Sequence, residues 1–117
     1  MKVIIAGSRT YKNYNELKQI CDFYLRNQKS VEIVSGGAKG ADLLGERYAK
    51  ERGLKIKVFT PDWERFGKKA GIIRNEEMAK YADGLIAFWD GQSRGTKHMI
   101  EYAKLRGLKV RVFEFKP

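Results

Sequence analysis

The sequence is poor in residues that build disulfide or metal frameworks. Its 117 residues include one cysteine, Cys21, and one histidine, His98. A single cysteine excludes an intramolecular disulfide and a cysteine-cluster metal site, and a single histidine excludes a histidine-rich zinc site. We therefore expect no metal and no cofactor, and this cysteine usage fits a reducing, cytoplasmic setting. Cys21 falls on an apolar helical stripe and is expected in the core.

Long hydrophobic runs are also missing. The first apolar run, residues 3–6, is far shorter than the ~7–15 residues of a signal-peptide core or the ~20 residues of a membrane span. We therefore expect no targeting segment and no membrane partner. The length fits one domain covering residues 1–117, and a hydrophobic share of 43% is sufficient for a core.

Acidic residues are outnumbered. Lys and Arg total 24 against 14 Asp and Glu, which gives a formal net charge of +10. A surplus of this size favours anionic partners, namely nucleic acid, nucleotides or an acidic surface, without deciding between them.

Short apolar segments alternate with segments of helical periodicity. The sequence predicts strands at residues 3–6, 31–35, 55–60, 84–89 and 109–115. It predicts helices at residues 15–27, 41–52, about 71–81 and 96–106. Alternation of this kind predicts an α/β fold in which helices cover both faces of a five-stranded, mainly parallel sheet. We expect a Rossmann-like, three-layer αβα architecture with strand order 3-2-1-4-5, and a crevice where the order reverses.

Three glycine-containing loops follow predicted strands and precede predicted helices. The first holds Gly7, Ser8 and Arg9. The second holds Ser35, Gly36, Gly37, Ala38, Lys39, Gly40 and Asp42. The third holds Gly91, Arg94, Gly95 and Thr96. Glycine lets main-chain N–H groups approach a phosphate, and the helix N-terminus that follows favours an anion. Strand-to-helix turns need glycine without any ligand, so one loop is weak evidence, but three at one edge favour a phosphate site.

The segment between the third strand and the third helix is a further candidate. Residues 61–75 read PDWERFGKKAGIIRN, and the part that precedes the predicted helix at about residue 71 is expected to form a long loop at the carboxyl edge of the sheet. The candidate ligand-binding residues here are Trp63, Lys69, Arg74 and Asn75. Arg74 falls in the first turns of a helix, where a cation opposes the helix dipole, and this placement suggests a site. Trp63, Phe66 or Trp89 could stack on a base, or these aromatic side chains could only pin the loop to the sheet.

Two other polar residues have ambiguous roles. Asp42 opens the second predicted helix, where a carboxylate is favourable without a ligand, although it could also accept a ribose hydroxyl. His98 follows Thr96 by two residues, and we expect a ligand-side hydrogen-bond donor or a surface residue rather than a catalytic base.

Three stretches of the chain together resemble a known family. They read IVSGGAKGAD, PDWERFGKKAGIIRNEEM and ADGLIAFWDGQSRGTKHMIEYAK. The sequence resembles the SLOG superfamily, which includes the DNA-processing protein A family and the Lonely Guy phosphoribohydrolases, and especially its small single-domain YspA-like branch of bacteria and phages. The resemblance covers nearly the whole chain. It implies a Rossmann-like fold and ligands that are nucleotides, nucleotide derivatives or single-stranded DNA.

The resemblance also assigns individual positions. Arg74 matches the catalytic arginine of the Lonely Guy enzymes, whereas the position of their catalytic glutamate falls on Met99. A thioether cannot activate water or stabilise an oxocarbenium-like transition state. Glu101 lies two residues further on, ~200° around the helix, and is a poor substitute. The resemblance therefore implies an intact binding apparatus and a damaged hydrolytic one.

Three hypotheses follow. In the first, the protein binds a nucleotide or a nucleotide-derived ligand, such as an ADP-ribose derivative, as a sensor or sequestering protein. In the second, it is a glycosidase that hydrolyses nucleoside monophosphates, using Arg74 with Asp42 or Asp90 as the carboxylate. In the third, it binds single-stranded nucleic acid. Relatives often form dimers, so we also expect a homodimer.

Overall fold

The centre of the molecule is a parallel five-stranded sheet in the order β3-β2-β1-β4-β5. The computed structural model describes residues 1–117. The strands are β1 (Lys2–Gly7), β2 (Glu32–Ser35), β3 (Lys55–Val58), β4 (Gly84–Trp89) and β5 (Lys109–Glu114). Every neighbouring pair is parallel. The predicted strand order and α/β class are therefore confirmed, because apolar residues on both faces of β1 and β4 require cover from both sides.

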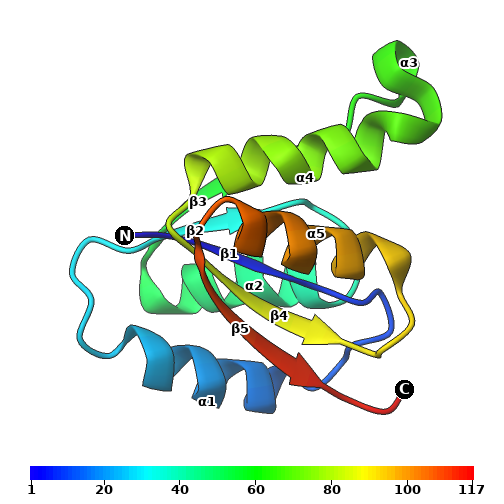
Figure 1. The fold of residues 1–117 in the computed structure, drawn as a ribbon. Helices are drawn as coiled ribbons and strands as arrows, with labels where there is room; N and C mark the ends of the chain where they lie inside the picture. The colour runs from blue at the N-terminus through cyan, green and yellow to red at the C-terminus, as the bar shows by residue number, and fades with distance from the viewer.

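Helices form a layer on each face of the sheet (Figure 1). The four longer helices are α1 (Tyr14–Leu25), α2 (Ala41–Arg52), α4 (Ala70–Tyr81) and α5 (Arg94–Leu105). One core joins α1 and α2 to one face of β1, β2 and β4, and includes Ile5, Leu17 and Phe88. The second core joins α4 and α5 to the other face, and includes Ile4, Met78 and Met99. No helix combines the length and the apolar character needed to cross a bilayer.

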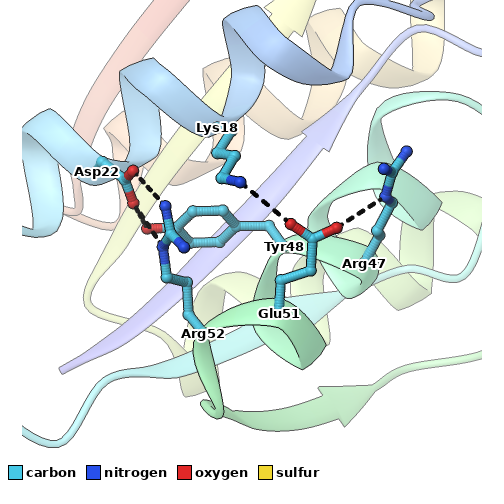
Figure 2. Close-up of polar contacts among 6 residues, drawn as sticks. All are labelled: Lys18, Asp22, Arg47, Tyr48, Glu51 and Arg52. Atoms are coloured by element: carbon cyan, nitrogen blue, oxygen red, sulfur yellow. Dashed lines mark hydrogen bonds and ion pairs between the residues drawn. The ribbon is translucent and has the colours of Figure 1, made fainter.

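Polar contacts connect α1 to α2 on the outside of the first layer (Figure 2). The Tyr48 hydroxyl donates to Asp22 Oδ1 at 2.7 Å, and Arg52 donates to both carboxylate oxygens of Asp22, at 3.0 and 2.6 Å. Lys18 Nζ lies 3.3 Å from Glu51 Oε1. These groups are partly exposed, so the contacts fix the packing of the two helices with a modest contribution to stability.

Residues 61–70 are not the long loop that the sequence predicts. They contain a short helix, α3 (Trp63–Phe66), and a 3-10 turn, η1 (Gly67–Lys69), and α4 begins directly afterwards at Ala70. The Asp62 side chain caps α3 by accepting a hydrogen bond from the Arg65 N–H at 3.1 Å. A helix of four residues has no periodicity to detect, so its cap is the only local signal. In Figure 1, α3 stands away from the sheet beyond the N-terminal end of α4.

Candidate functional site

A cavity of about 110 Å³ opens at the carboxyl edge of the sheet, where β1 lies between β2 and β4. This is the position at which parallel α/β sheets bind ligands. The predicted residues that line it are Gly7, Arg9, Ala38, Asp42, Arg74, Asn75, Gly95 and Thr96. Ala6, Met78, Ser93 and Met99 complete the wall and are residues that the sequence analysis did not propose as ligand contacts.

Two helices begin at this cavity without a side-chain cap. The N-cap positions of α2 and α5 are Gly40 and Ser93, and neither side chain accepts a hydrogen bond from the first turn. In contrast, α1 and α3 are capped by Asn13 and Asp62. The Ala41 N–H at the start of α2 donates to the Ser8 carbonyl oxygen at 3.4 Å. The positive end of the helix dipole and any first-turn N–H groups that are left without a protein partner favour an anion at such positions. The two ends therefore provide an electropositive, hydrogen-bonding rim.

Glycine is required at two positions of the loop between β2 and α2. Gly40 has a φ of 79°, and a Cβ there would lie 2.3 Å from the Ser8 carbonyl oxygen. A Cβ at Gly36 would lie 2.7 Å from Arg74 Nη1 and 2.8 Å from Asp42 Oδ2. The absence of a side chain at Gly36 therefore allows the guanidinium and the carboxylate to approach the same segment of main chain.

The guanidinium of Arg74 points into the molecule and borders the cavity. Its Nη1 donates to the Gly36 carbonyl oxygen at 2.6 Å, and its Nε donates to Asn75 Oδ1 at 3.1 Å. Burial lowers the pKa of Arg74, and the nearby Asp42 carboxylate opposes this effect. An arginine stays protonated at neutral pH even so, which leaves a fixed positive charge at the wall of the cavity.

Asp42 is the carboxylate that lines the cavity. The residue is 4% exposed, and its Oδ2 accepts a hydrogen bond from the Ala38 N–H at 3.3 Å. Burial raises the pKa of Asp42 to about 6, against the opposing effects of the Ala38 N–H and the Arg74 charge. Asp90 differs, because its Oδ1 accepts hydrogen bonds from the N–H groups of Gln92 and Ser93, which hold its pKa below the ordinary value. Asp90 therefore shapes the third loop and does not line the cavity.

The hydroxyls of the two serines in the predicted loops form hydrogen bonds within the protein. Ser8 Oγ accepts a hydrogen bond from the Asp90 N–H at 3.1 Å. Ser35 Oγ accepts from the Gly37 N–H at 3.0 Å and donates to Glu46 Oε2 at 2.7 Å. Both residues are buried, and neither lines the cavity. The Ser8 hydroxyl therefore connects the first loop to the third, and the Ser35 hydroxyl holds its own loop against α2.

Several predicted residues lie outside the cavity wall. The exposed ones are Gly37, Lys39, Lys69, Gly91 and Arg94. Trp63 is 56% exposed on α3, and Trp89 directs its indole N–H to the Ser93 carbonyl oxygen at 3.0 Å. Neither indole lines the cavity.

The third loop and α5 add three observations. Met99 is 1% exposed and lines the cavity, so the position that the resemblance gives to a catalytic glutamate does face the site. Glu101 is exposed, as the helical spacing predicts. His98 Nδ1 lies 3.2 Å from Asn75 Nδ2, and its Nε2 lies 3.9 Å from Glu76 Oε2. Glu76 lies on α4 and His98 on α5, so no local sequence pattern signals that the two are neighbours.

The fold and the position of the cavity define a Rossmann-like α/β protein with a polar site at the reversal of strand order. Residues 1–66 match the model of the YspA, cpYpsA-related SLOG family, and the chain belongs to this family. It is similar to the gene 61 protein of Mycobacterium phage D29, with 37% identity over 123 residues that cover 99% of this chain and 98% of the relative. The SLOG resemblance seen in the sequence is thereby confirmed.

Solved structures of the same fold include larger chains. DNA processing protein A (DprA) from Streptococcus pneumoniae aligns with a TM-score of 0.77 and 22% identity, covering 95% of this chain and 49% of that one. The protein TM1055 aligns with a TM-score of 0.68 and 23% identity, covering 93% of this chain and 71% of that one. At these identities the similarity establishes the fold, and this chain spans about half of the DprA chain.

Proposed function

We propose that the protein binds a nucleotide or a nucleotide-derived ligand at the carboxyl edge of the sheet, as a sensor or sequestering protein. Membership of the SLOG family supports a function related to nucleotides or nucleic acids in general. The observation that carries the specific proposal is the inward Arg74 guanidinium, which donates to Gly36 at 2.6 Å beside two uncapped helix N-termini.

Phosphate is the group that best matches these surroundings. The N-terminal turns of α2 and α5 offer main-chain donors, and Arg74 supplies a formal charge that is shielded from water. The volume of about 110 Å³ is below the roughly 300–1,000 Å³ of pockets that enclose drug-sized ligands. The phosphate and sugar would therefore enter the cavity, and the base would lie over the exposed rim that includes Arg9, Lys39 and Arg94.

Calorimetry with adenosine monophosphate, ADP and ADP-ribose tests this proposal directly. Arg74→Gln removes the charge and should weaken binding by about tenfold or more, because a charge-assisted hydrogen bond contributes roughly 1.5–3 kcal/mol. Arg106→Gln is the matched control, since Arg106 is an exposed arginine at the opposite, C-terminal end of α5. If no nucleotide binds, or if both variants weaken binding equally, the proposed site is wrong.

A hydrolytic function is a second candidate because of Asp42. It combines burial, a pKa of about 6 and a position beside Arg74, which suits a general acid. Release of free base from a panel of nucleoside monophosphates, abolished by Asp42→Asn, would support it. Binding without base release would favour a sensor.

Single-stranded nucleic acid is the third candidate, supported by the net charge of +10. Binding to an oligonucleotide should weaken steeply with salt, because counterions are released from the nucleic acid. Arg74→Gln and Arg106→Gln should then have similar effects. A homodimer and a cytoplasmic location stay predictions, and light scattering tests the first.

A further inference from the structure

The amide of Asn75 joins three parts of the candidate site. Asn75 is 5% exposed and follows Arg74 on α4. Its Oδ1 accepts the Nε–H of Arg74 at 3.1 Å. Its Nδ2 lies 3.2 Å from the Gly95 carbonyl oxygen and 3.2 Å from His98 Nδ1, both on α5. One buried side chain therefore links the site arginine to the first turn of the helix that borders the cavity.

These partners fix the orientation of the amide. A guanidinium nitrogen can only donate, so the amide oxygen must face Arg74. A main-chain carbonyl can only accept, so the amide nitrogen must face Gly95. The second N–H of Asn75 then points at His98 Nδ1, which has to accept it. His98 is therefore neutral in this arrangement, with its proton on Nε2, on the side of Glu76 Oε2 at 3.9 Å.

We propose that Asn75 and His98 are positioning residues that hold Arg74 at the cavity, and that protonation of His98 releases this hold and weakens anion binding. The inference rests on the proposed function, in which Arg74 faces the ligand phosphate. A protonated imidazole carries N–H groups on both nitrogens, so Nδ1–H would face the Asn75 N–H. Rotation of the amide would bring its oxygen against the Gly95 carbonyl and its nitrogen against the Arg74 Nε–H. Either arrangement loses a hydrogen bond, so the affinity for the anion should be lower when His98 is protonated.

Other groups lie close to the hydrogen-bonded chain of Arg74, Asn75 and His98, which we call the positioning relay. The Glu76 carboxylate on α4 lies 3.9 Å from His98 Nε2, and Tyr102 stacks on the ring with centroids 5.9 Å apart. Protonation of Asp42, beside Arg74, should raise the affinity for an anionic ligand, because it removes a negative charge that repels the ligand. This effect is opposite to that of His98 protonation. The wild type and the His98 variants all retain Asp42, so a comparison of their profiles cancels the Asp42 contribution.

The experiment measures the affinity for ADP-ribose between pH 5.5 and 8.0. Its phosphates form a diester, so the probe lacks the second phosphate ionisation near pH 6 that would confuse the profile. His98→Asn can present an amide oxygen at the Nδ1 position and does not titrate, whereas His98→Leu offers no acceptor. The wild type should bind about tenfold more weakly at pH 5.5 than at pH 7.5, relative to the profile of His98→Asn. His98→Leu should bind about tenfold more weakly than His98→Asn at pH 7.5.

Nuclear magnetic resonance of the free protein provides a readout that needs no ligand. His98 is the single histidine, so its imidazole signals are assigned without variants. The expected spectrum at pH 7.5 shows the Nε2–H tautomer of His98 and an Arg74 Nε proton that is protected from exchange with solvent. This protection should be kept in His98→Asn and lost in His98→Leu. An Nδ1–H tautomer, or equal protection in the two variants, overturns the inference.

The two proposals fail in distinguishable ways. If Arg74→Gln weakens ADP-ribose binding but the wild type and His98→Asn share one pH profile, the positioning relay is wrong and the site stands. If the tautomer and the Arg74 protection are as expected but Arg74→Gln leaves binding unchanged, the relay is a real structural element and the proposed phosphate site is wrong.

Discussion

The substitution Asp42→Asn should make the free protein more stable at neutral pH, although it removes the carboxylate from the candidate site. The folded state raises the pKa of Asp42 from 3.8 to about 6, chiefly through burial. At about 1.4 kcal/mol per pH unit, this difference means that the ionised carboxylate costs the folded state up to about 3 kcal/mol. The sign follows from proton binding: between these two values the folded chain holds the proton and the unfolded chain releases it. The cost is therefore absent below pH 3.8, grows to about pH 6 and is constant above it.

Urea unfolding of the wild type and Asp42→Asn at pH 4.0, 5.0, 6.0 and 7.5 measures this effect. The two should have similar free energies of unfolding at pH 4.0, and Asp42→Asn should be more stable by up to about 3 kcal/mol at pH 7.5. Glu77→Gln, which removes an exposed carboxylate, controls for the change in net charge. A variant less stable than the wild type at pH 7.5, or a difference that does not change with pH, would refute the reasoning.

Three further substitutions separate the binding role of a residue from its structural role. Gly95→Ala adds a Cβ with no atom within 4 Å in the first turn of α5, so the unfolding free energy should stay level or rise by up to about 1 kcal/mol while calorimetry shows weaker nucleotide binding. Gly40→Ala forces a side chain to a φ of 79° and against the Ser8 carbonyl, so urea unfolding should show a loss of more than about 2 kcal/mol. Asp22→Asn removes the charged partner of Arg52, and its partly exposed position limits the expected loss to about 1 kcal/mol in the same assay. Equal losses at Gly40 and Gly95 would contradict the distinction between them.

The layered sheet could be predicted from the sequence because a parallel strand that is covered on both faces consists of a continuous run of apolar residues. The runs ending at Gly7 and Trp89 and the helical stripes between them specify the strand order together with general rules of connection. Helix boundaries were shifted by one or two residues, as at Ala70 and Arg94, where local turns set the start.

The details of the site depend on contacts that join distant parts of the chain. Glycine positions and Arg74 were visible in the sequence, since each departs from a local preference. The use of the Ser8 and Ser35 hydroxyls inside the protein was not visible, because a hydroxyl can face a ligand or a neighbouring loop equally well. The contact between Asn75 and His98 spans 23 residues and two helices, and no local pattern signals it.

The indole of Trp89 gives this protein a built-in optical reporter. Its N–H donates to the Ser93 carbonyl at the start of α5, and Ser93 lines the cavity, so a displacement of that turn alters the hydrogen bonding of the ring. The other tryptophan, Trp63, is largely exposed on α3 and contributes a background that Trp63→Phe removes. Emission from the remaining indole then follows events at the rim of the cavity without any attached dye.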